Sequence, residues 1–216
     1  MNKEWLDILS EYFNSMDWRR VRLRINTCRK TMTIYPESKN VFKAFAVTPY
    51  DTVKVVLLGQ DPYINEHEAS GLSFGITPKC KSVPQSLKTI IKEVQSDCYP
   101  DTAYTPDYTL ESWANQGVLL LNTALTVAAG ESGSHTLLWT EFTDSVIEAL
   151  NQKTNLIWIL LGGKAQKFEH RINKSHYIIK AGHPSPLNRK RDFPGSKIFS
   201  KCNLKLQEYK LETIKW

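Results

Sequence analysis

Four polar side chains in this sequence follow apolar runs, at the points where strands are expected to end. Gln60 and Asp61 follow residues 53–58, with only Gly59 between. Asn122 follows a run of leucines, and His183 follows a β-branched stretch. Because the carboxyl ends of parallel strands share one edge of a sheet, where ligands bind in open α/β sheets, we expect these groups to meet. The sequence therefore predicts one site made of a carboxylate, an imidazole and two carboxamides.

Two aromatic residues, Tyr63 and Phe74, lie close in the sequence to the first of these strand ends. An asparagine such as Asn122 offers both a hydrogen-bond donor and an acceptor. A carboxamide beside flat rings is suited to a planar heterocycle that has its own donor and acceptor edge. The combination favours recognition of a nucleobase.

The motifs of several other enzyme classes are absent. No serine lies in a Gly-x-Ser-x-Gly turn, which disfavours an esterase, and no Gly-x-x-x-x-Gly-Lys-[Ser/Thr] loop supports nucleoside triphosphate hydrolysis. The four cysteines include no Cys-x-x-Cys pair, and the histidines lack the usual metal-binding spacings. We therefore expect free thiols and no metal site.

The elements that must position the polar groups alternate between strands and helices. Apolar and β-branched runs predict strands at 53–58, 118–121, 156–161 and 176–181. Helical periodicity and start signals predict helices at 3–16, from Pro36, from Pro84, at 110–116, 140–152 and 199–211, and one ending at Phe168. This alternation predicts an α/β fold, a three-layer α/β/α sandwich with a central four-stranded parallel twisted sheet. Without a repeat, linker or composition break, residues 1–216 are expected to form a single domain.

The composition is that of an intracellular protein. Hydrophobic residues make up 41% of the chain, yet no uninterrupted apolar run reaches the roughly 18 residues of a membrane span. The first residues lack the basic and apolar regions of a secretory signal. We expect a cytoplasmic protein that makes no membrane contact, or a nuclear one if its source is eukaryotic or viral.

The excess of basic residues is concentrated in two places. Lysine and arginine number 28 against 22 acidic residues, which gives a net charge of +6. Arginines cluster within residues 19–24, and a second basic group extends from Arg189 to Lys201, just after His183. Positive charge beside a candidate site is suited to an anionic polymer, nucleic acid foremost.

Six motifs are distributed along the chain, at residues 59–63 (GQDPY), 71–74 (GLSF), 84–87 (PQSL), 117–123 (GVLLLNT), 134–135 (SH) and 183–187 (HPSPL). In their order and spacing these motifs resemble those of family 1 uracil-DNA glycosylases. The resemblance implies a monofunctional hydrolase that cleaves the N-glycosidic bond of uracil in single- or double-stranded DNA and leaves an abasic site for base-excision repair. It also implies a monomer that needs no metal or organic cofactor, and a DNA groove that proteinaceous inhibitors can occupy.

The resemblance implies roles in catalysis and recognition for the strand-end residues. Enzymes of this family extrude the target base from the stack. Asp61 would stabilise the sugar cation and orient water, while a neutral His183 would donate a hydrogen bond to uracil O2. Phe74 would stack on uracil and Asn122 would read its polar edge. In the same pocket, Gln60 would contribute through its backbone, and Tyr63 would lie against C5 and exclude the thymine methyl group.

A second set of residues would contact DNA by the same resemblance. Leu187 would enter the space that the flipped nucleotide leaves. Ser86 and Ser185, supported by His135, would grip the neighbouring phosphates. Arg189 would add a diffuse attraction for the DNA backbone.

Two other functions are considered beside uracil excision. One is a DNA-binding or replication accessory protein that keeps the fold without catalysis, and Asp61 and His183 argue against it. The other is a glycosylase of altered base preference, such as one acting on mismatched thymine, and Tyr63 argues against it by blocking the thymine methyl group.

The sequence also departs from the family pattern in residues 64–70, at Gln85 and Gly182, and in residues 192–199. These departures bear on rate and DNA affinity.

Overall fold

A computed structural model describes residues 1–216 of the protein, and its centre is a four-stranded parallel sheet. The strands lie in the order β3-β2-β5-β6 and are all parallel. All residues of β2, β3 and β5 are buried, as expected for strands covered on both faces. This confirms the predicted sheet, with strand bounds β2 (Val55–Gly59), β3 (Val118–Asn122), β5 (Ile157–Leu161) and β6 (Tyr177–Ala181).

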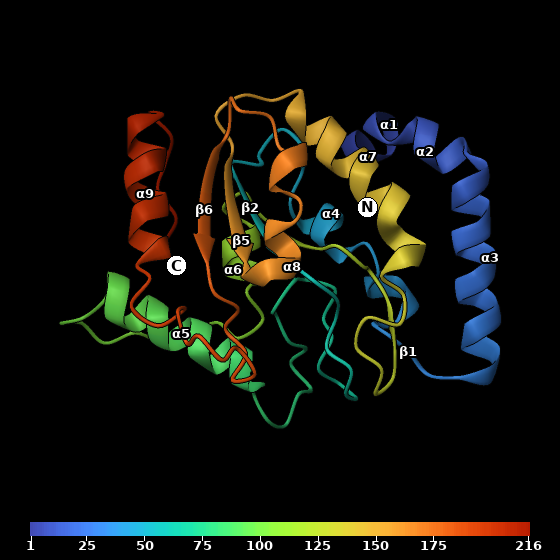
Figure 1. Ribbon diagram of the computed structural model, residues 1–216, viewed down its shortest axis with the longest axis horizontal. Coiled ribbons are helices and arrows are strands. Elements are labelled where there is room, and N and C mark those ends of the chain that lie inside the picture. The colour runs from blue at the N-terminus through green and yellow to red at the C-terminus, as the bar shows by residue number, and fades with distance from the viewer.

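Helices cover both sides of the sheet. Figure 1 shows α9 on one side, next to β6, and α7 with the N-terminal helices on the other. The α-helices are α1 (Lys3–Ile8), α2 (Ser10–Asn14), α3 (Met16–Thr31), α4 (Lys43–Val47), α5 (Gln85–Cys98), α6 (Glu111–Ala114), α7 (Thr140–Asn151), α8 (Gly162–Gln166) and α9 (Ile198–Glu208). Short 3-10 helices occupy Ser38–Asn40, Leu137–Trp139 and Glu169–Arg171. No helix has both the length and the apolar character that a membrane span requires.

The N-terminal region differs from the prediction. The helix predicted over residues 3–16 is divided into α1 and α2. A new helix begins at Met16, and Ser15 caps it, because the Ser15 Oγ accepts a hydrogen bond from Trp18 N at 3.1 Å. This helix, α3, was not predicted, since only three of its residues, Val21, Ile25 and Cys28, are buried. Such a thin apolar stripe gives a weak periodic signal.

A further prediction about local structure was wrong. No helix begins at Pro36, because the chain there leaves a two-residue strand, β1 (Ile34–Tyr35), and becomes helical only later. Strand β1 pairs with β4 (Val127–Ala128) in a small antiparallel sheet that is too short to leave a sequence pattern.

One hydrophobic core includes residues from both ends of the chain. Trp5 is fully buried, and its Nε1 donates a hydrogen bond to the Thr48 carbonyl oxygen at 2.9 Å. Trp216 packs edge-to-face on Trp113 at 5.2 Å and on Phe199 at 5.0 Å between ring centroids. Both terminal segments are therefore packed against the body that carries the sheet.

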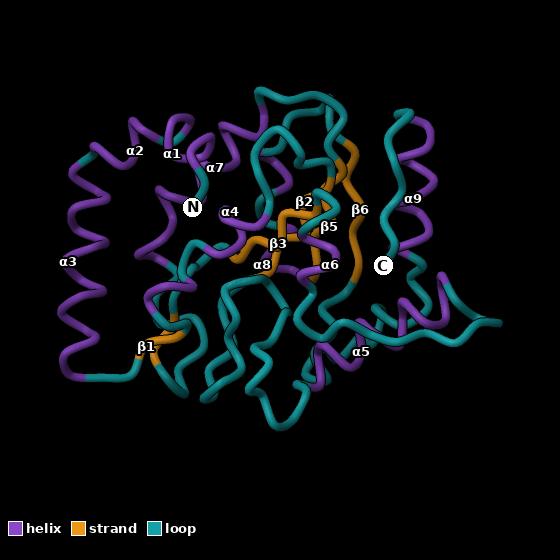
Figure 2. Tube along the Cα trace, turned by 180° about the vertical axis from the view of Figure 1, so that it is seen from behind, coloured by secondary structure: helices purple, strands orange, loops and turns teal.

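The order of the strands reverses at one place in the sheet. From β2 the chain passes to β3 on one side and then to β5 on the other. Figure 2 shows long loops gathered below the strands, between β1 and α5. Crevices form at such switch points, beyond the carboxyl ends of the strands.

Candidate active site

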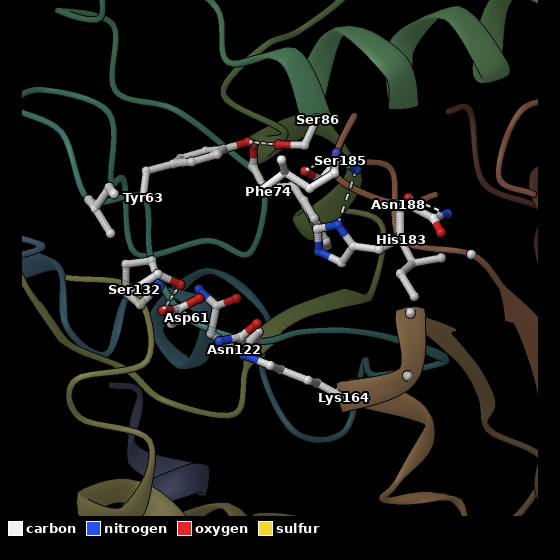
Figure 3. A pocket seen from close by; sticks show the side chains of 18 of the residues that line it. Asp61, Tyr63, Phe74, Ser86, Asn122, Ser132, Lys164, His183, Ser185 and Asn188 are labelled. Carbon is white, nitrogen blue, oxygen red and sulfur yellow. Dashed lines mark hydrogen bonds between the residues drawn. The ribbon is translucent and has the colours of Figure 1, made fainter. Parts of the chain in front are cut away.

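A cleft of about 830 Å³ lies at the carboxyl ends of the parallel strands. It is formed by the ends of β2, β3, β5 and β6 together with the loops that follow them. Figure 3 shows the side chains of its lining converging from these separate segments. Except for His135, every predicted site residue lines the cleft: Gln60, Asp61, Tyr63, Phe74, Ser86, Asn122, His183, Ser185, Leu187 and Arg189.

Asp61 is anchored through one of its two carboxylate oxygens. Its Oδ2 accepts hydrogen bonds from Ser132 Oγ at 2.9 Å and from Gly133 N at 2.5 Å. Its Oδ1 accepts no hydrogen bond from the protein and stays available to a ligand. Sequence reasoning missed Ser132 and Gly133. Their position just before the Ser134–His135 motif was the only signal for them.

His183 follows β6 and is held in one tautomer. Its Nδ1 accepts a hydrogen bond from Ser185 N at 3.1 Å, so the proton of the neutral ring lies on Nε2. The ring approaches the end of β5 so closely that a Cβ on Gly162 would lie 2.7 Å from the His183 Cβ. Gly162, which also has a φ of +82°, therefore makes room for the imidazole. The neutral ring presents an N–H donor to the cleft.

The electrostatic surroundings keep His183 neutral. Burial lowers the pKa of the imidazole, the negative charge of Asp61 opposes this shift, and the positive charge of Lys164 adds to it. Lys164 lines the cleft, and Figure 3 shows its side chain reaching toward Asn122. Sequence analysis missed this lysine, although it follows a strand that ends at the same edge of the sheet.

We expect Lys164→Met to raise the pKa of His183, because the substitution removes a positive charge that disfavours the imidazolium. A titration of the His183 ring followed by NMR measures this pKa in both proteins. Lys167→Met is the matched control, since Lys167 belongs to the same chain segment but does not line the cleft. A pKa that is unchanged or lower in Lys164→Met would contradict the expected influence of this charge.

Two aromatic rings form a constrained wall of the cleft. The Tyr63 hydroxyl donates to the Phe74 carbonyl oxygen at 2.9 Å and lies 3.4 Å from Ser86 Oγ. Phe74 has a φ of +62°, a left-handed conformation that is strained for a residue with a side chain. Burial raises the pKa of Tyr63, so its hydroxyl stays protonated and keeps this bond. The Phe74 ring lies 5.9 Å from that of His183, at an interplanar angle of 50°.

Unpaired amide groups face the same space. Asn122 is only 7% exposed, and its side chain makes no hydrogen bond within the protein. Gln60 Nε2 is buried without a partner, whereas the backbone carbonyl oxygen of Gln60 accepts hydrogen bonds from Ala124 N at 2.9 Å and Thr123 Oγ1 at 2.8 Å. Buried polar groups are nearly always paired, so these amides are suited to a polar ligand.

The rim of the cleft carries an exposed apolar side chain and several polar ones. Leu187 is 88% exposed, which is unusual for a leucine. Ser185 Oγ accepts a hydrogen bond from Leu187 N at 3.2 Å, and Ser86 lies in the first turn of α5. Arg189 completes this rim. The rim therefore offers hydroxyl groups and positive charge around a leucine side chain.

His135 does not line the cleft. It is only 8% exposed, and its Nδ1 is 2.8 Å from Thr126 Oγ1, which accepts a hydrogen bond from Trp139 Nε1 at 2.8 Å. Burial, followed by the charges of Arg24 and Arg29, lowers the pKa of its imidazole. The structure thus gives His135 a place in supporting the loop that anchors Asp61.

The fold and the cleft together define an α/β protein whose ligand site lies at the switch point of a parallel sheet. The site pairs a carboxylate with a neutral imidazole beside groups suited to a planar base. A sequence model of the uracil DNA glycosylase superfamily matches residues 45–207. The chain belongs to this superfamily, as its motifs predict.

Relatives with similar sequences extend over the whole chain. The chain is 43% identical over 222 residues to the uracil-DNA glycosylase of Lachnoclostridium phytofermentans, covering 100% of this chain and 96% of that one. It is 45% identical over 222 residues to the uracil-DNA glycosylase of Anoxybacillus flavithermus, with the same coverage.

Solved structures agree with the sequence relationship. The crystal structure of mimivirus uracil-DNA glycosylase superposes on this protein with a TM-score of 0.90, over 100% of this chain and 87% of that one. The two sequences are 28% identical. A variant of the mimivirus protein in complex with UGI gives a TM-score of 0.91 at 28% identity, over 100% and 88% of the two chains. The predicted family and fold class are confirmed.

Proposed function

We propose that this protein hydrolyses the N-glycosidic bond of uracil in DNA and leaves an abasic site for base-excision repair. The observation that carries the proposal is the convergence of Asp61, His183 and Asn122 in one cleft. Relatives named uracil-DNA glycosylase, 43% identical over the whole chain, support the same activity. The target base must leave the helix to reach the cleft, because its glycosidic bond is inaccessible inside a stacked duplex.

Recognition of uracil would use the aromatic wall and the unpaired amides. The base would stack on Phe74 while Asn122 pairs with its N3–H and O4. Thymine offers the same hydrogen-bonding edge and differs only by its C5 methyl group. The ring of Tyr63, held by its bond to the Phe74 carbonyl oxygen, would stand where that methyl group would lie.

Bond cleavage would place opposite charges at the two ends of the breaking bond. As the C1′–N1 bond breaks, both electrons leave with uracil and the sugar gains oxocarbenium character. His183 Nε2–H would donate to uracil O2, where the negative charge develops. Asp61 would stabilise the cation and orient a water molecule, whose oxygen bonds to C1′ as the water gives a proton to the Asp61 carboxylate. Gln60 would complete the pocket.

The rim would hold the DNA, single- or double-stranded. Leu187 would fill the space that the flipped nucleotide leaves, and Ser86 and Ser185 would bind phosphates, while Arg189 attracts the backbone. His135 would support this contact indirectly.

We infer that residues 1–216 act as one domain and as a monomer, in the cytoplasm or, for a eukaryotic or viral source, in the nucleus. The mimivirus relative in complex with UGI supports the further proposal that a protein can also occupy this groove.

A cleavage assay tests the proposed function. The protein is incubated, in buffer containing EDTA, with single-stranded and duplex oligonucleotides that carry one uracil, thymine or cytosine, and abasic sites are then cut with alkali. We expect strand cleavage at uracil alone. No cleavage at uracil would refute the proposed activity and favour a DNA-binding accessory function, for which retention of the oligonucleotides without cleavage is the signature.

We expect Tyr63→Ala to reduce the preference for uracil over thymine by about 10–100-fold. Space for one methyl group in a pocket changes the ratio of kcat/KM between two substrates by roughly this factor. The ratio of kcat/KM for the two bases measures the preference. Tyr63→Phe is the matched control, since it keeps the ring and removes only the hydroxyl, and it should still exclude thymine. Equal preference in Tyr63→Ala and the unchanged protein would show that another group excludes the methyl.

A further inference from the structure

In the loop that follows His183, the side chain of Asn188 forms hydrogen bonds with both the histidine and Asp192. Asn188 Nδ2 donates to the His183 carbonyl oxygen at 3.0 Å and to Asp192 Oδ1 at 2.8 Å. We refer to this pair of residues as the Asn188–Asp192 clamp. The hydrogen bond from Asn188 lowers the pKa of Asp192, so the carboxylate is ionised at neutral pH and accepts this bond.

The clamp leaves no room for a side chain at position 182. A Cβ on Gly182 would lie 1.8 Å from Asp192 Oδ1 and 2.6 Å from Asn188 Nδ2. The carboxylate therefore lies directly against the backbone that leads into His183. Gly182 and Asp192 are both positions at which this sequence departs from the family pattern, and the structure shows that the two departures fit each other.

We propose that Asn188 and Asp192 are positioning residues that hold His183 in place for catalysis, and that Gly182 is needed to admit the Asp192 carboxylate. The proposal rests on the proposed function. The clamp restrains the His183 carbonyl oxygen, and Ser185 N restrains the ring through Nδ1. One restraint acts on the backbone of His183 and the other on its ring, and together they hold the direction of Nε2. A catalytic group that is displaced by about 1 Å can lose a hundredfold in rate.

A simpler role for Asp192 makes a different prediction. Asp192 lines the cleft and is exposed, so its negative charge could merely weaken the binding of DNA. Asparagine in its place removes the charge but keeps an oxygen that accepts the Asn188 hydrogen bond. Alanine removes both. The two substitutions therefore separate a positioning role from an effect of charge.

The first experiment compares kcat and KM for a single-stranded uracil oligonucleotide. We expect Asp192→Ala and Asn188→Ala to lower kcat by about tenfold. Asp192→Asn should restore kcat to within about twofold of the unchanged protein, because it preserves the hydrogen bond. Asp101→Ala is the control for loss of charge, because Asp101 is an exposed carboxylate outside the cleft. Equal kcat in Asp192→Ala and Asp192→Asn, with KM lowered in both, would overturn the proposal.

The second experiment tests the pairing of Gly182 with Asp192. Gly182→Ala should lower kcat, because its methyl group displaces the carboxylate. In the double variant Gly182→Ala/Asp192→Ala the clamp is already broken by the loss of Asp192, and the methyl group then meets only Asn188 Nδ2, the end of a side chain that has lost its partner. The kcat of the double variant should therefore be no lower than that of Asp192→Ala alone. Losses that multiply in the double variant would show that the two residues act independently and would refute the clamp.

An NMR measurement separates this proposal from the proposed function. The ring signals of His183 should shift in Asp192→Ala and return toward their original positions in Asp192→Asn, whether or not uracil is released. If the unchanged protein releases no uracil, the proposed function fails and the ring signals still test the clamp. If uracil is released and both the ring signals and kcat of Asp192→Ala match the unchanged protein, only the clamp is refuted.

Discussion

Asp61→Asn lowers kcat for uracil release by about 10²–10⁴-fold, the range for loss of a positioned group that handles a proton. Asparagine has the same shape, and its oxygen can accept the hydrogen bonds that Ser132 and Gly133 donate to Asp61. The amide nitrogen of the asparagine then takes the place of the free carboxylate oxygen in the cleft, and the side chain carries no charge. It can neither stabilise the sugar cation nor accept a proton from water. Single-turnover release of uracil measures the loss.

Binding and folding must be followed in the same variant. Fluorescence anisotropy with a uracil oligonucleotide should give an affinity equal to or higher than that of the unchanged protein, because a negative charge near DNA has been removed. Asp101→Asn is the control for a carboxylate outside the cleft. If Asp61→Asn folds, binds DNA and releases uracil at the unchanged rate, Asp61 has no part in the reaction.

His183→Ala lowers kcat by about 10²–10³-fold, the usual effect of removing one donor to a developing oxyanion. The substitution leaves uracil O2 without the Nε2–H group that the bond from Ser185 N to Nδ1 selects. His170→Ala is the matched control, because His170 is exposed and lies outside the cleft. Comparable losses in the two variants would contradict the role of His183.

The pH dependence gives an independent check on His183. Protonation would prevent Nδ1 from accepting the Ser185 hydrogen bond and would disturb the orientation of the ring. The rate should therefore fall as the pH drops through the pKa of His183, which burial and Lys164 lower, so full activity should persist below the ordinary pKa of histidine. This acid limb should be absent from His183→Ala.

The strands and the residues at their ends could be predicted from the sequence because buried parallel strands leave long apolar runs. Asp61, Asn122 and His183 each stand beside such a run, and parallel topology places the three together. The aromatic pair was found through motifs, since Phe74 lies in a loop without periodicity. Its positive φ and its bond to Tyr63 depend on tertiary contacts.

Contacts between distant loops could not be predicted in this way. Gly133 binds a carboxylate 72 positions earlier in the chain, and no local pattern reports such a pairing. The Asn188–Asp192 clamp was missed for the same reason. The weak periodicity of α3 hid a helix of 16 residues, because most of its surface is polar.

The unusual segment over residues 64–70 has a structural explanation at its end. Ser70 is one of the residues that depart from the family pattern, and it is only 1% exposed. Its Oγ donates to the Gly75 carbonyl oxygen at 2.9 Å and accepts from Leu72 N at 3.2 Å. Ser70 thus supports the turn that leads to Phe74.

The exposed Leu187 has a consequence for the entropy of DNA binding. The loop that carries it is already fixed by hydrogen bonds among Ser185, Asn188 and His183 in the free protein. Its conformational freedom is therefore lost when the chain folds and not when it meets DNA. A leucine that is held ready in this way can enter a gap in the base stack as soon as thermal motion opens one.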